Sequence, residues 1–552
     1  MPVEFKHHIQ RVSMVSLSKE LTLARQLLKK GNLEAARQKF ATIFRLAPNM
    51  TKASLEYASI LERMRLWPDL LVVCETLYEK APNDVEFNSQ LFKLYIKLGR
   101  FEEAELKLNK LEQLNPGTYE LAVQKYSYAT SSGKTQDALH YAIEAVKLRP
   151  DSISAYINLG AAFCGLGMRE QGRHAFETVL HLDPENVFAF SNLAYIAAEE
   201  LRVDEALDLY QQTLTLNKNY RVLSDASIQF PLSFQYLHKG ILDRGWECYD
   251  IGFDLALPSG SRRSPDRKFH KLKWSGENIL NKKILVWREQ GLGDELRFLG
   301  VLPDLIAIAK DVIIECDPRL VNIFRRSFPS SAVRPAQWDI KTGKSIEEDY
   351  DLQIPIGSLM RYLRKDITDF YPQRILLTPD ENDREQIKSV FNNIFSTGLK
   401  IGICWRSGQL DPVRNSGYTN LADWAEILQM NGCHFVTLQY GDTESEIKAA
   451  EAALGITIHR WSDLDLKNDL DGVFALMSEL DLVISVGTAV AEMAPLVGTE
   501  TWQLFAGKPW TMLGQNKWPW APNVQSFYPE SGINMAHTMG AVTDALRKRV
   551  FQ

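Results

Sequence analysis

The sequence predicts an all-α repeat solenoid followed by an α/β region. Proline recurs at residues 48, 82, 116, 150 and 184, a constant interval of 34 residues. A fixed period of this length indicates repeated helical hairpins. From residue 283 onward, short β-rich runs alternate with helical patterns, which predicts parallel sheets. The composition changes between the two parts, because Trp67 is the only one of the 12 tryptophans that precedes residue 221. Two kinds of structure are therefore joined near residues 220–275.

The 34-residue period is that of the tetratricopeptide repeat, in which each unit is a pair of antiparallel helices. Small residues recur where the two helices must approach closely, and large or apolar residues recur four positions later. These columns place six repeats at residues 17–50, 51–84, 85–118, 119–152, 153–186 and 187–220. Such hairpins stack into a superhelix with an extended concave groove. We expect the groove to bind a protein partner; the alternative is a solenoid that only holds domains together or mediates self-association.

An extension at residues 1–16 precedes the repeats, and a helical capping segment and linker at residues 221–276 follow them. The linker is rich in Ser, Pro, Arg and Lys, as expected of a surface connection. Its basic cluster consists of Arg262, Arg263, Arg267 and Lys268. Contact with phosphate is one interpretation of this cluster, and a solvated linker is the one we favour.

The α/β region is predicted to form two Rossmann-like halves, at residues 277–380 and 381–552, that face a cleft. Expected strands in the first half are KKILVW, DVIIEC and DLQIP, with one helix over DELRFLGVLPDLIAIA. A polar helix near 379–396 precedes the strands LKIGICW, HFVTLQ, TIHRW, DLVISV and TWQLF. Ligands bind such sheets beyond the carboxyl ends of the strands.

Two loops at predicted strand ends are candidate sites. Gly291 and Gly293 follow the first strand, where they allow a tight turn and a close approach to a ligand, and Asp294 lies at or near a helix N-cap. The second loop follows DLVIS and contains Gly487, Thr488, Ala489 and Val490. Amides at the start of its helix favour an anion, with the Thr488 hydroxyl as a further donor. Neither loop matches GxGxxG or GxxxxGK[ST], which argues against a dehydrogenase or a nucleoside triphosphatase.

Further candidates lie in the second half. Arg406 ends its first strand and is either a ligand contact or an ion-pair partner. Gln439 and Tyr440 follow the next strand and either shape a base or ribose pocket or form a plain turn. We expect core packing for most of the aromatic residues Trp502, Trp510, Trp518 and Trp520. Surface and cap roles are favoured over metal binding for the DxD-like pairs Asp463/Asp465 and Asp469/Asp471.

Charge, cysteine usage and hydropathy exclude several classes. The net charge of −6 is too mild for a nucleic-acid or membrane-surface protein. The 6 cysteines form no CxxC pair, which fits neither a zinc site nor a disulfide framework. The start, MPVEFKHHIQRVSMVSLSK, lacks a signal-peptide pattern, and no apolar run reaches the length of a membrane span. We therefore expect a cytoplasmic protein.

Several segments carry a resemblance to a known family. EQGLGDELRF, LPDL, ECDPRL, GICWRSG, LQYGD and DLVISVGTAVAEMAPLVG are similar to bacterial proteins that fuse tetratricopeptide repeats to a heptosyltransferase-like glycosyltransferase domain. The resemblance covers about residues 225–550, and flagellin glycosyltransferases are among the family. It implies a two-Rossmann fold of the GT-B type and a metal-independent, inverting transferase with a nucleotide-sugar co-substrate and no cofactor.

The resemblance also implies roles for individual residues. Asp294 occupies the place of the family's proposed general base. The family's late motif binds the donor phosphates with an Asp-Thr-Gly or Asp-Thr-Ala step that ends in His. Here Gly487 replaces the Asp and Glu492 replaces the His, while Thr488 and Ala489 match. Donor-binding residues are expected at Gly291, Gly293, Arg406, Gln439, Tyr440, Gly487, Thr488, Ala489, Val490 and Glu492.

The function expected is transfer of a sugar, with a CMP-linked nonulosonic acid as first choice of donor and a UDP- or ADP-sugar as second. The acceptor is Ser or Thr of a protein such as flagellin, held by the repeat groove. Two alternatives stay open: a scaffold whose transferase half is inactive, and a transferase that acts on lipopolysaccharide or polysaccharide.

Overall fold

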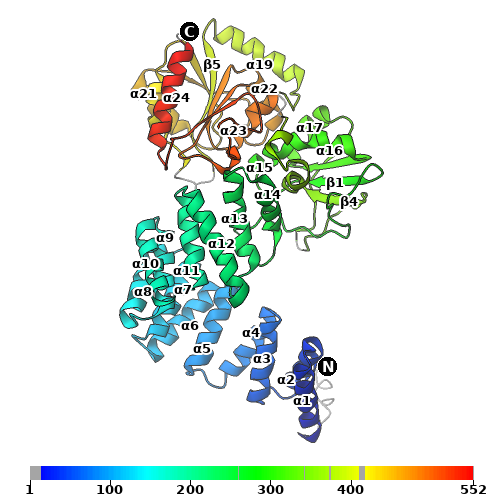
Figure 1. Ribbon diagram of the computed structural model, residues 1–552, viewed down its shortest axis with the longest axis vertical. Coiled ribbons are helices and arrows are strands. Elements are labelled where there is room, and N and C mark those ends of the chain that lie inside the picture. Colours follow the sequence, from blue (N-terminus) through cyan, green and yellow to red (C-terminus); the bar gives the residue numbers. More distant parts are fainter. Residues whose placement is uncertain (1–13, 259, 341, 372–374, 409–416, 551–552) are drawn as a thin grey trace, which may run out of the picture. The chain divides into compact units, whose positions relative to one another are not determined.

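A computed structural model describes residues 14–258, 260–340, 342–371, 375–408 and 417–550. The chain divides into two compact units, Met1–Ala189 and Phe190–Gln552. The predicted fold class is confirmed, because helical hairpins come first and two parallel sheets follow (Figure 1). Residues 1–13 of the predicted N-terminal extension lie outside the described residues, and the first described helix begins at Met14.

Paired helices build the first unit (Figure 1). Glycines 31, 99, 133 and 167 have positive φ in the turns inside four of these pairs, a conformation that favours glycine. Asp84, Thr118 and Ser152 cap the helices that follow them through their side-chain oxygens. The helices are α1 Met14–Lys29, α2 Leu33–Leu46, α3 Thr51–Arg63, α4 Trp67–Tyr78, α5 Val85–Lys97, α6 Phe101–Leu114, α7 Tyr119–Ser131, α8 Thr135–Leu148, α9 Ile153–Gly165 and α10 Arg169–Leu182.

The small-residue columns of the sequence lie where paired helices touch. A Cβ built on Gly160 in α9 would lie 2.6 Å from the ring of Phe176 in α10. On the partner helix, a Cβ on Gly172 would lie 2.7 Å from the Cys164 sulfur. Side chains at these positions would force the two helices apart, so the alternation of small and large residues fixes the hairpin.

More helices begin the second unit: α11 Val187–Glu199, which spans the boundary between the units, α12 Val203–Tyr220, α13 Asp225–His238 and α14 Leu242–Asp250. The segment after α14 is not a solvated linker throughout. Arg263 and Arg267 are 1% and 9% exposed and pair with Glu289 and Glu315. The interpretation of these two arginines as solvated is wrong, because each neutralises a carboxylate buried at the first sheet.

The first sheet has the order β3-β2-β1-β4, with all strands parallel. Gly300 and Pro303 interrupt the single helix expected over 294–309, which instead forms α15, a 3-10 turn and α16. The elements are β1 Lys283–Trp287, α15 Leu292–Arg297, α16 Leu302–Ile308, β2 Asp311–Cys316, α17 Val321–Ser327, β3 Ala332–Pro335, β4 Leu352–Pro355 and α18 Met360–Leu363.

The second sheet has the order β10-β9-β8-β5-β6-β7 and is also parallel. Helices α21 and α24 cover one face, and α19 and α22 cover the other (Figure 1). Burial on both faces explains why its central strands are continuously apolar. The elements are α19 Glu381–Ile394, β5 Leu399–Cys404, α20 Ala425–Leu428, β6 Cys433–Thr437, α21 Glu444–Leu454, β7 Ile458–His459, α22 Leu470–Ser478, β8 Leu482–Val486, α23 Ala489–Met493, β9 Thr501–Leu504, β10 Val524–Phe527 and α24 Met535–Val550.

One hydrophobic core joins α13, α14, the first sheet and one face of the second. Trp246 in α14 lies within it and is 1% exposed. Its ring packs edge-on against Phe298 of the first half and Trp510 and Trp520 of the second. The core packing expected for the C-terminal tryptophans is thus confirmed, with Trp502 and Trp518 buried and Trp510 and Trp520 partly buried against the core.

Candidate functional site

The first glycine loop connects β1 to α15 and carries Asp294. Gly291 is the N-cap of α15, and its amide donates to Asp294 Oδ2 at 3.2 Å. The other oxygen, Oδ1, lies 3.5 Å from Arg297 Nη1. One third of the Asp294 side chain is exposed (33%). The carboxylate therefore caps the helix with one oxygen, and the other lies beside the Arg297 guanidinium.

A buried polar network holds the start of this loop. Glu289 is fully buried, accepts from Gly357 N at 2.7 Å and pairs with Arg263 through both oxygens. The next residue, Gln290, has φ 54 and donates to the Tyr249 hydroxyl at 2.6 Å. Leaving Glu289 without its partner would strand a charge in the interior. The network thus fixes the chain four and five residues before Asp294.

The two halves meet where α15 approaches α23. A Cβ on Gly293 would lie 3.6 Å from the Ala489 Cα, an ordinary van der Waals contact that shows the two helix starts are side by side. Arg297 of α15 donates to Glu492 Oε1 of α23 from Nη2 at 2.7 Å and from Nε at 3.1 Å. Burial raises the pKa of Glu492, and the guanidinium of Arg297 opposes that rise. The structure thus brings Gly293 and Asp294 together with Ala489 and Glu492.

The second glycine loop connects β8 to α23. Thr488 is the N-cap residue, yet its side chain makes no cap hydrogen bond. Its hydroxyl lies 3.1 Å from Ser485 Oγ and 3.7 Å from Cys404 Sγ. A Cβ on Gly487 would lie 3.0 Å from the Phe505 ring, and Val490 is buried in the first turn of α23. The loop therefore packs closely against Phe505, Ser485 and Cys404. The start of α23 lies at the same edge of the sheet as the end of β5.

The β5 and β6 ends hold the remaining predicted residues. Gln439 is 2% exposed, and its Oε1 accepts from Trp405 N at 3.1 Å and Arg406 N at 3.0 Å. The Arg406 guanidinium donates to Glu446 Oε2 at 2.8 Å, which is the ion-pair alternative for that residue. The Tyr440 hydroxyl lies 3.3 Å from Ser407 Oγ. Gln439 thus orders the loop after β5, and Arg406 is committed to a carboxylate of α21.

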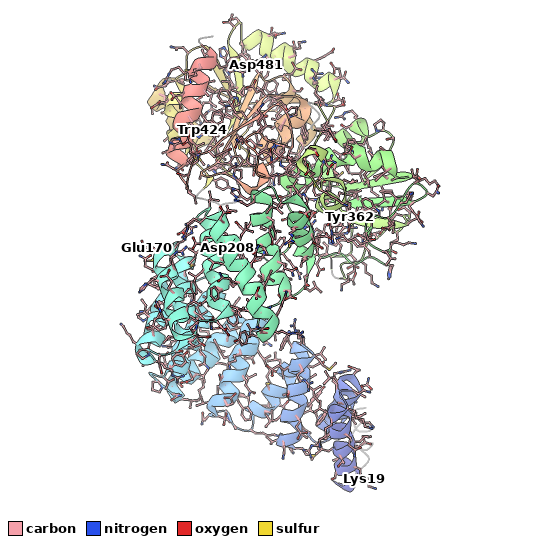
Figure 2. The ribbon with its side chains drawn as sticks, in the orientation of Figure 1. Lys19, Glu170, Asp208, Tyr362, Trp424 and Asp481 are labelled. Carbon is pink, nitrogen blue, oxygen red and sulfur yellow. The ribbon has the colours of Figure 1, made fainter. Side chains whose placement is uncertain are left out.

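Asp481, labelled in Figure 2, marks the opposite edge of this sheet. It precedes β8 and accepts from Lys400 N at 2.8 Å at the start of β5. Cys404 and Ser485 are the last register pair at the other end of the same two strands. Every candidate residue of the second half named above therefore lies on the carboxyl side of the sheet, where ligands of parallel sheets bind.

The DxD-like pairs take local structural roles. Asp469 caps α22 by accepting from Gly472 N at 3.1 Å, as expected. Asp465 accepts from the amides of Lys467 and Asn468, and Asp471 pairs with Arg326. Within the described part of the chain, no group of three or more His, Cys, Asp or Glu side chains is placed to hold a metal ion. All six cysteines are free thiols.

Sequence reasoning missed the residues that support the site. Nothing in the sequence indicated a buried role for Arg263, because it stands in a polar segment whose composition is typical of a surface connection. The sequence did contain a signal for Arg297, because it lies one helical turn after Asp294. A glutamate at 492, within the apolar run AVAEMAPLVG, is a second signal that a cation lies nearby. Of the helices in the described ranges, none combines the length and apolar character needed to span a bilayer.

Comparisons with known proteins match both parts of the chain. A tetratricopeptide-repeat family profile matches residues 165–220. The protein FlbA of Caulobacter vibrioides is 29% identical over 425 residues, which cover 75% of this chain and 70% of that protein. The protein O-mannosyl-transferase Tmtc3 of Drosophila melanogaster is 30% identical over 105 residues, 16% of this chain and 11% of that one. A crystallised tetratricopeptide repeat protein from Parabacteroides merdae has 13% identity and a TM-score of 0.35, covering 43% of this chain and 91% of that chain.

Proposed function

We propose that this chain is a glycosyltransferase that moves a sugar from a nucleotide-activated donor to Ser or Thr of a protein bound by the repeats. One observation carries the proposal: Asp294, at the carboxyl edge of the first sheet, lies on the helix that contacts the start of α23, at the carboxyl edge of the second sheet. A base and an anion-favouring helix start are thus adjacent but come from separate halves.

The chemistry follows from these two groups. A hydroxyl is a poor nucleophile, so the Asp294 carboxylate takes its proton as it attacks the anomeric carbon. The departing nucleotide phosphate develops negative charge, which the amides of residues 488–490 and the Thr488 hydroxyl stabilise. One displacement inverts the anomeric configuration. Because Arg406 is committed to Glu446, we assign phosphate binding to the α23 loop rather than to that guanidinium.

Relatives support the proposal at two points. The match to FlbA spans 425 residues, so it extends from the repeats into the α/β region. Tmtc3 is named as a protein O-mannosyl-transferase, an enzyme that transfers sugar to protein, and its match covers 105 residues. Together with the resemblance to flagellin glycosyltransferases, these matches favour a protein acceptor such as flagellin. A CMP-linked nonulosonic acid stays our first choice of donor and a UDP- or ADP-sugar the second.

An inactive scaffold is the second candidate, and a specific observation favours it. Two residues assigned to donor binding, Arg406 and Glu492, are each engaged with an oppositely charged partner in the protein. If Arg406 stays paired with Glu446, the donor phosphates lose that cationic contact, and Glu492, a carboxylate, supplies none.

Asp294→Asn separates the two candidates. The amide oxygen of asparagine keeps the cap on Gly291 N but does not accept a proton, so we expect transfer to fall by roughly two orders of magnitude or more while the fold is retained. The full-length protein is incubated with candidate CMP-, UDP- and ADP-sugars and flagellin, and the flagellin is weighed intact.

Asp366→Asn is the matched control. Asp366 caps a short 3-10 helix in the same half by accepting from Thr368 N, and we expect its substitution to leave transfer unchanged. A wild type that adds no mass with any donor supports the scaffold. If Asp294→Asn transfers sugar as fast as the wild type, Asp294 is not the base and serves only as a helix cap.

A further inference from the structure

The carboxyl ends of β1 and β2 carry a four-residue ion cluster outside the site described above. Arg288 directly follows β1, and Asp317 directly follows β2. Arg288 Nη1 lies 3.0 Å from Asp317 Oδ2, and Arg319 Nε lies 2.8 Å from Asp317 Oδ1. Glu295 of α15 completes the cluster, with Oε2 3.0 Å from Arg288 Nε and Oε1 accepting from Asp317 N at 3.0 Å. We call these four residues the Arg288 cluster.

The net charge of the Arg288 cluster depends on the protonation of Glu295. Burial raises the pKa of Glu295 to about 7, and Arg288 only partly opposes the rise. Its Oε2 makes no hydrogen bond, although it is buried and lies close to Arg288. The other carboxyl, Asp317, has a pKa below its usual range: burial would raise it, but hydrogen bonds from Arg319 and the charge of Arg288 outweigh that effect. Near neutral pH, two guanidinium cations therefore face one full carboxylate and one that is partly protonated.

The arginines also remain within reach of solvent. Arg288 and Arg319 side chains are 19% and 31% exposed. By contrast, Arg263 and Arg267, which pair with carboxylates in the same half, have side chains that are 0% exposed. Those two ion pairs are buried and stabilise the fold. The cations of the Arg288 cluster instead lie at the carboxyl edge of the sheet, where ligands bind.

The second half borders the same place. Arg319 Nη1 donates to Lys467 O at 2.7 Å, and Tyr440 lies near enough to influence Arg319 electrostatically. A ligand held between the halves therefore passes close to the Arg288 cluster. Arg319 also donates from Nη2 to Asp317 Oδ2 at 3.0 Å, so each of its three nitrogens already has a protein acceptor. A guanidinium has five N–H donors, so each Nη nitrogen of Arg319 keeps a second N–H for a phosphate or carboxylate oxygen.

We propose that Arg288 and Arg319 form an oxyanion-binding subsite, with Glu295 setting its charge, for a phosphate or carboxylate group of the ligand that the two halves hold. This inference rests on the proposed function and deepens it, because it gives the substrate an anionic group in addition to the phosphate placed at α23. Protonation of Glu295 leaves net positive charge, so oxyanion binding and protonation of Glu295 favour each other.

The test measures dissociation constants of sulfate and of glucuronate for the full chain at constant ionic strength. Sulfate represents a phosphate and keeps its charge from pH 5.5 to 8.5, and glucuronate represents the carboxylate of a sugar acid. Arg319→Gln is expected to weaken the better of the two probes roughly tenfold or more, as for loss of a charge-assisted hydrogen-bond partner. Preference for sulfate assigns the subsite to phosphate, and preference for glucuronate assigns it to a carboxylate.

Arg326→Gln is the matched control, because Arg326 is equally exposed (30%) and its ion pair with Asp471 also links the two halves. We expect its affinity for both probes to stay within about twofold of wild type, as for a partly exposed ion pair. If circular dichroism shows that Arg319→Gln does not fold, Arg319→Lys replaces it. Lysine keeps the positive charge but lacks the paired N–H donors of the guanidinium, so binding is still expected to weaken.

The pH profile tests Glu295. The charged groups that face it are Arg288, Asp317 and Arg319, and the thiol of Cys316 lies nearby. Wild-type affinity should fall as pH rises through about 7, and Glu295→Gln should remove this dependence because its side chain stays neutral. Equal affinities in wild type and both Arg319 variants, or a wild type that binds neither probe, would overturn the subsite. Sugar transfer without such binding would leave the transferase proposal standing.

Discussion

Glu492 shows how one residue changes the chemistry of a loop. Glu492 is a buried carboxylate in the first turn of α23, and it holds Arg297 of the other half. Glu492 therefore brings a cation to the start of this helix. Arg297 in turn lies beside Asp294, so the pair connects the residue assigned as base to the helix assigned to the phosphates.

A double-mutant cycle on Arg297 and Glu492 measures this connection. Arg297→Met or Glu492→Leu alone leaves a buried charge without its partner, which should cost about 3–5 kcal/mol of unfolding free energy. The double variant replaces both charges with apolar groups and should be considerably more stable than the sum of the two losses predicts. Urea unfolding, followed by the tryptophan fluorescence of the α/β region, gives the coupling energy.

The exposed pair Arg547 and Asp544 on α24 is the control cycle, since its side chains are 52% and 67% exposed. Its coupling energy should stay within about 0.5 kcal/mol, as for one helical turn on a surface. Strictly additive losses at Arg297 and Glu492 would show that the buried pair does not couple the two halves.

At the scale of elements, the hairpin of α13 and α14 belongs to the α/β region as much as to the helices before it. Trp246 contacts Phe298 of one half and Trp510 of the other, and Tyr249 binds the loop that leads to Asp294 through Gln290. The hairpin is thus a third support for the site, alongside the two sheets.

Trp246→Ala tests this role. Removing a fully buried tryptophan should cost about 3–5 kcal/mol, and the loss should reach both halves because they share its core. Hydrogen–deuterium exchange should therefore increase in β1 and β8 together. Phe40→Ala is the matched control: Phe40 is 0% exposed in the first unit, and its loss should raise exchange in α2 and leave β1 and β8 unchanged. Increased exchange confined to α14 would contradict a shared core.

The helices and strands also show which features of the fold can be predicted from the sequence. The 34-residue period and the apolar strands were sufficient to predict the fold class, because hairpin and sheet patterns are local. Strands β3 and β10 were missed, since AVRP and VQSF are short and weakly apolar. At the candidate site, strand-end motifs predicted Asp294 and the α23 loop, and their roles stay predictions. Arg263 and Arg288 were not predicted, because their carboxylate partners lie in other elements and only the fold reveals them. Arg297 was missed although it lies one helical turn after Asp294.

At the scale of the whole molecule, the boundary between the units determines at which residue a chain without the repeats should begin. Deleting residues 1–220 would expose Ile228, Leu232 and Tyr236 of α13, which are buried in a cluster with Leu207 and Tyr210 of α12. A chain that begins at Val187 keeps α11 and α12 and so keeps this cluster covered. We expect that chain to fold and the one that begins at residue 221 to aggregate.

The chain that begins at Val187 then tests what the repeats contribute. If they hold the protein acceptor, the truncated chain should still hydrolyse or bind the donor, while its transfer to intact flagellin falls by roughly two orders of magnitude, since the acceptor must then be captured from solution without an additional binding surface. Intact mass of the flagellin and release of free nucleotide, measured on the same samples, separate the two activities. A short Ser/Thr peptide serves as control, because a small acceptor should gain little from the groove and be modified at similar rates by both chains. Equal transfer to flagellin by the truncated and full chains would remove the repeats from acceptor recognition and favour a role in assembly, with a glycan acceptor as the substrate to examine next.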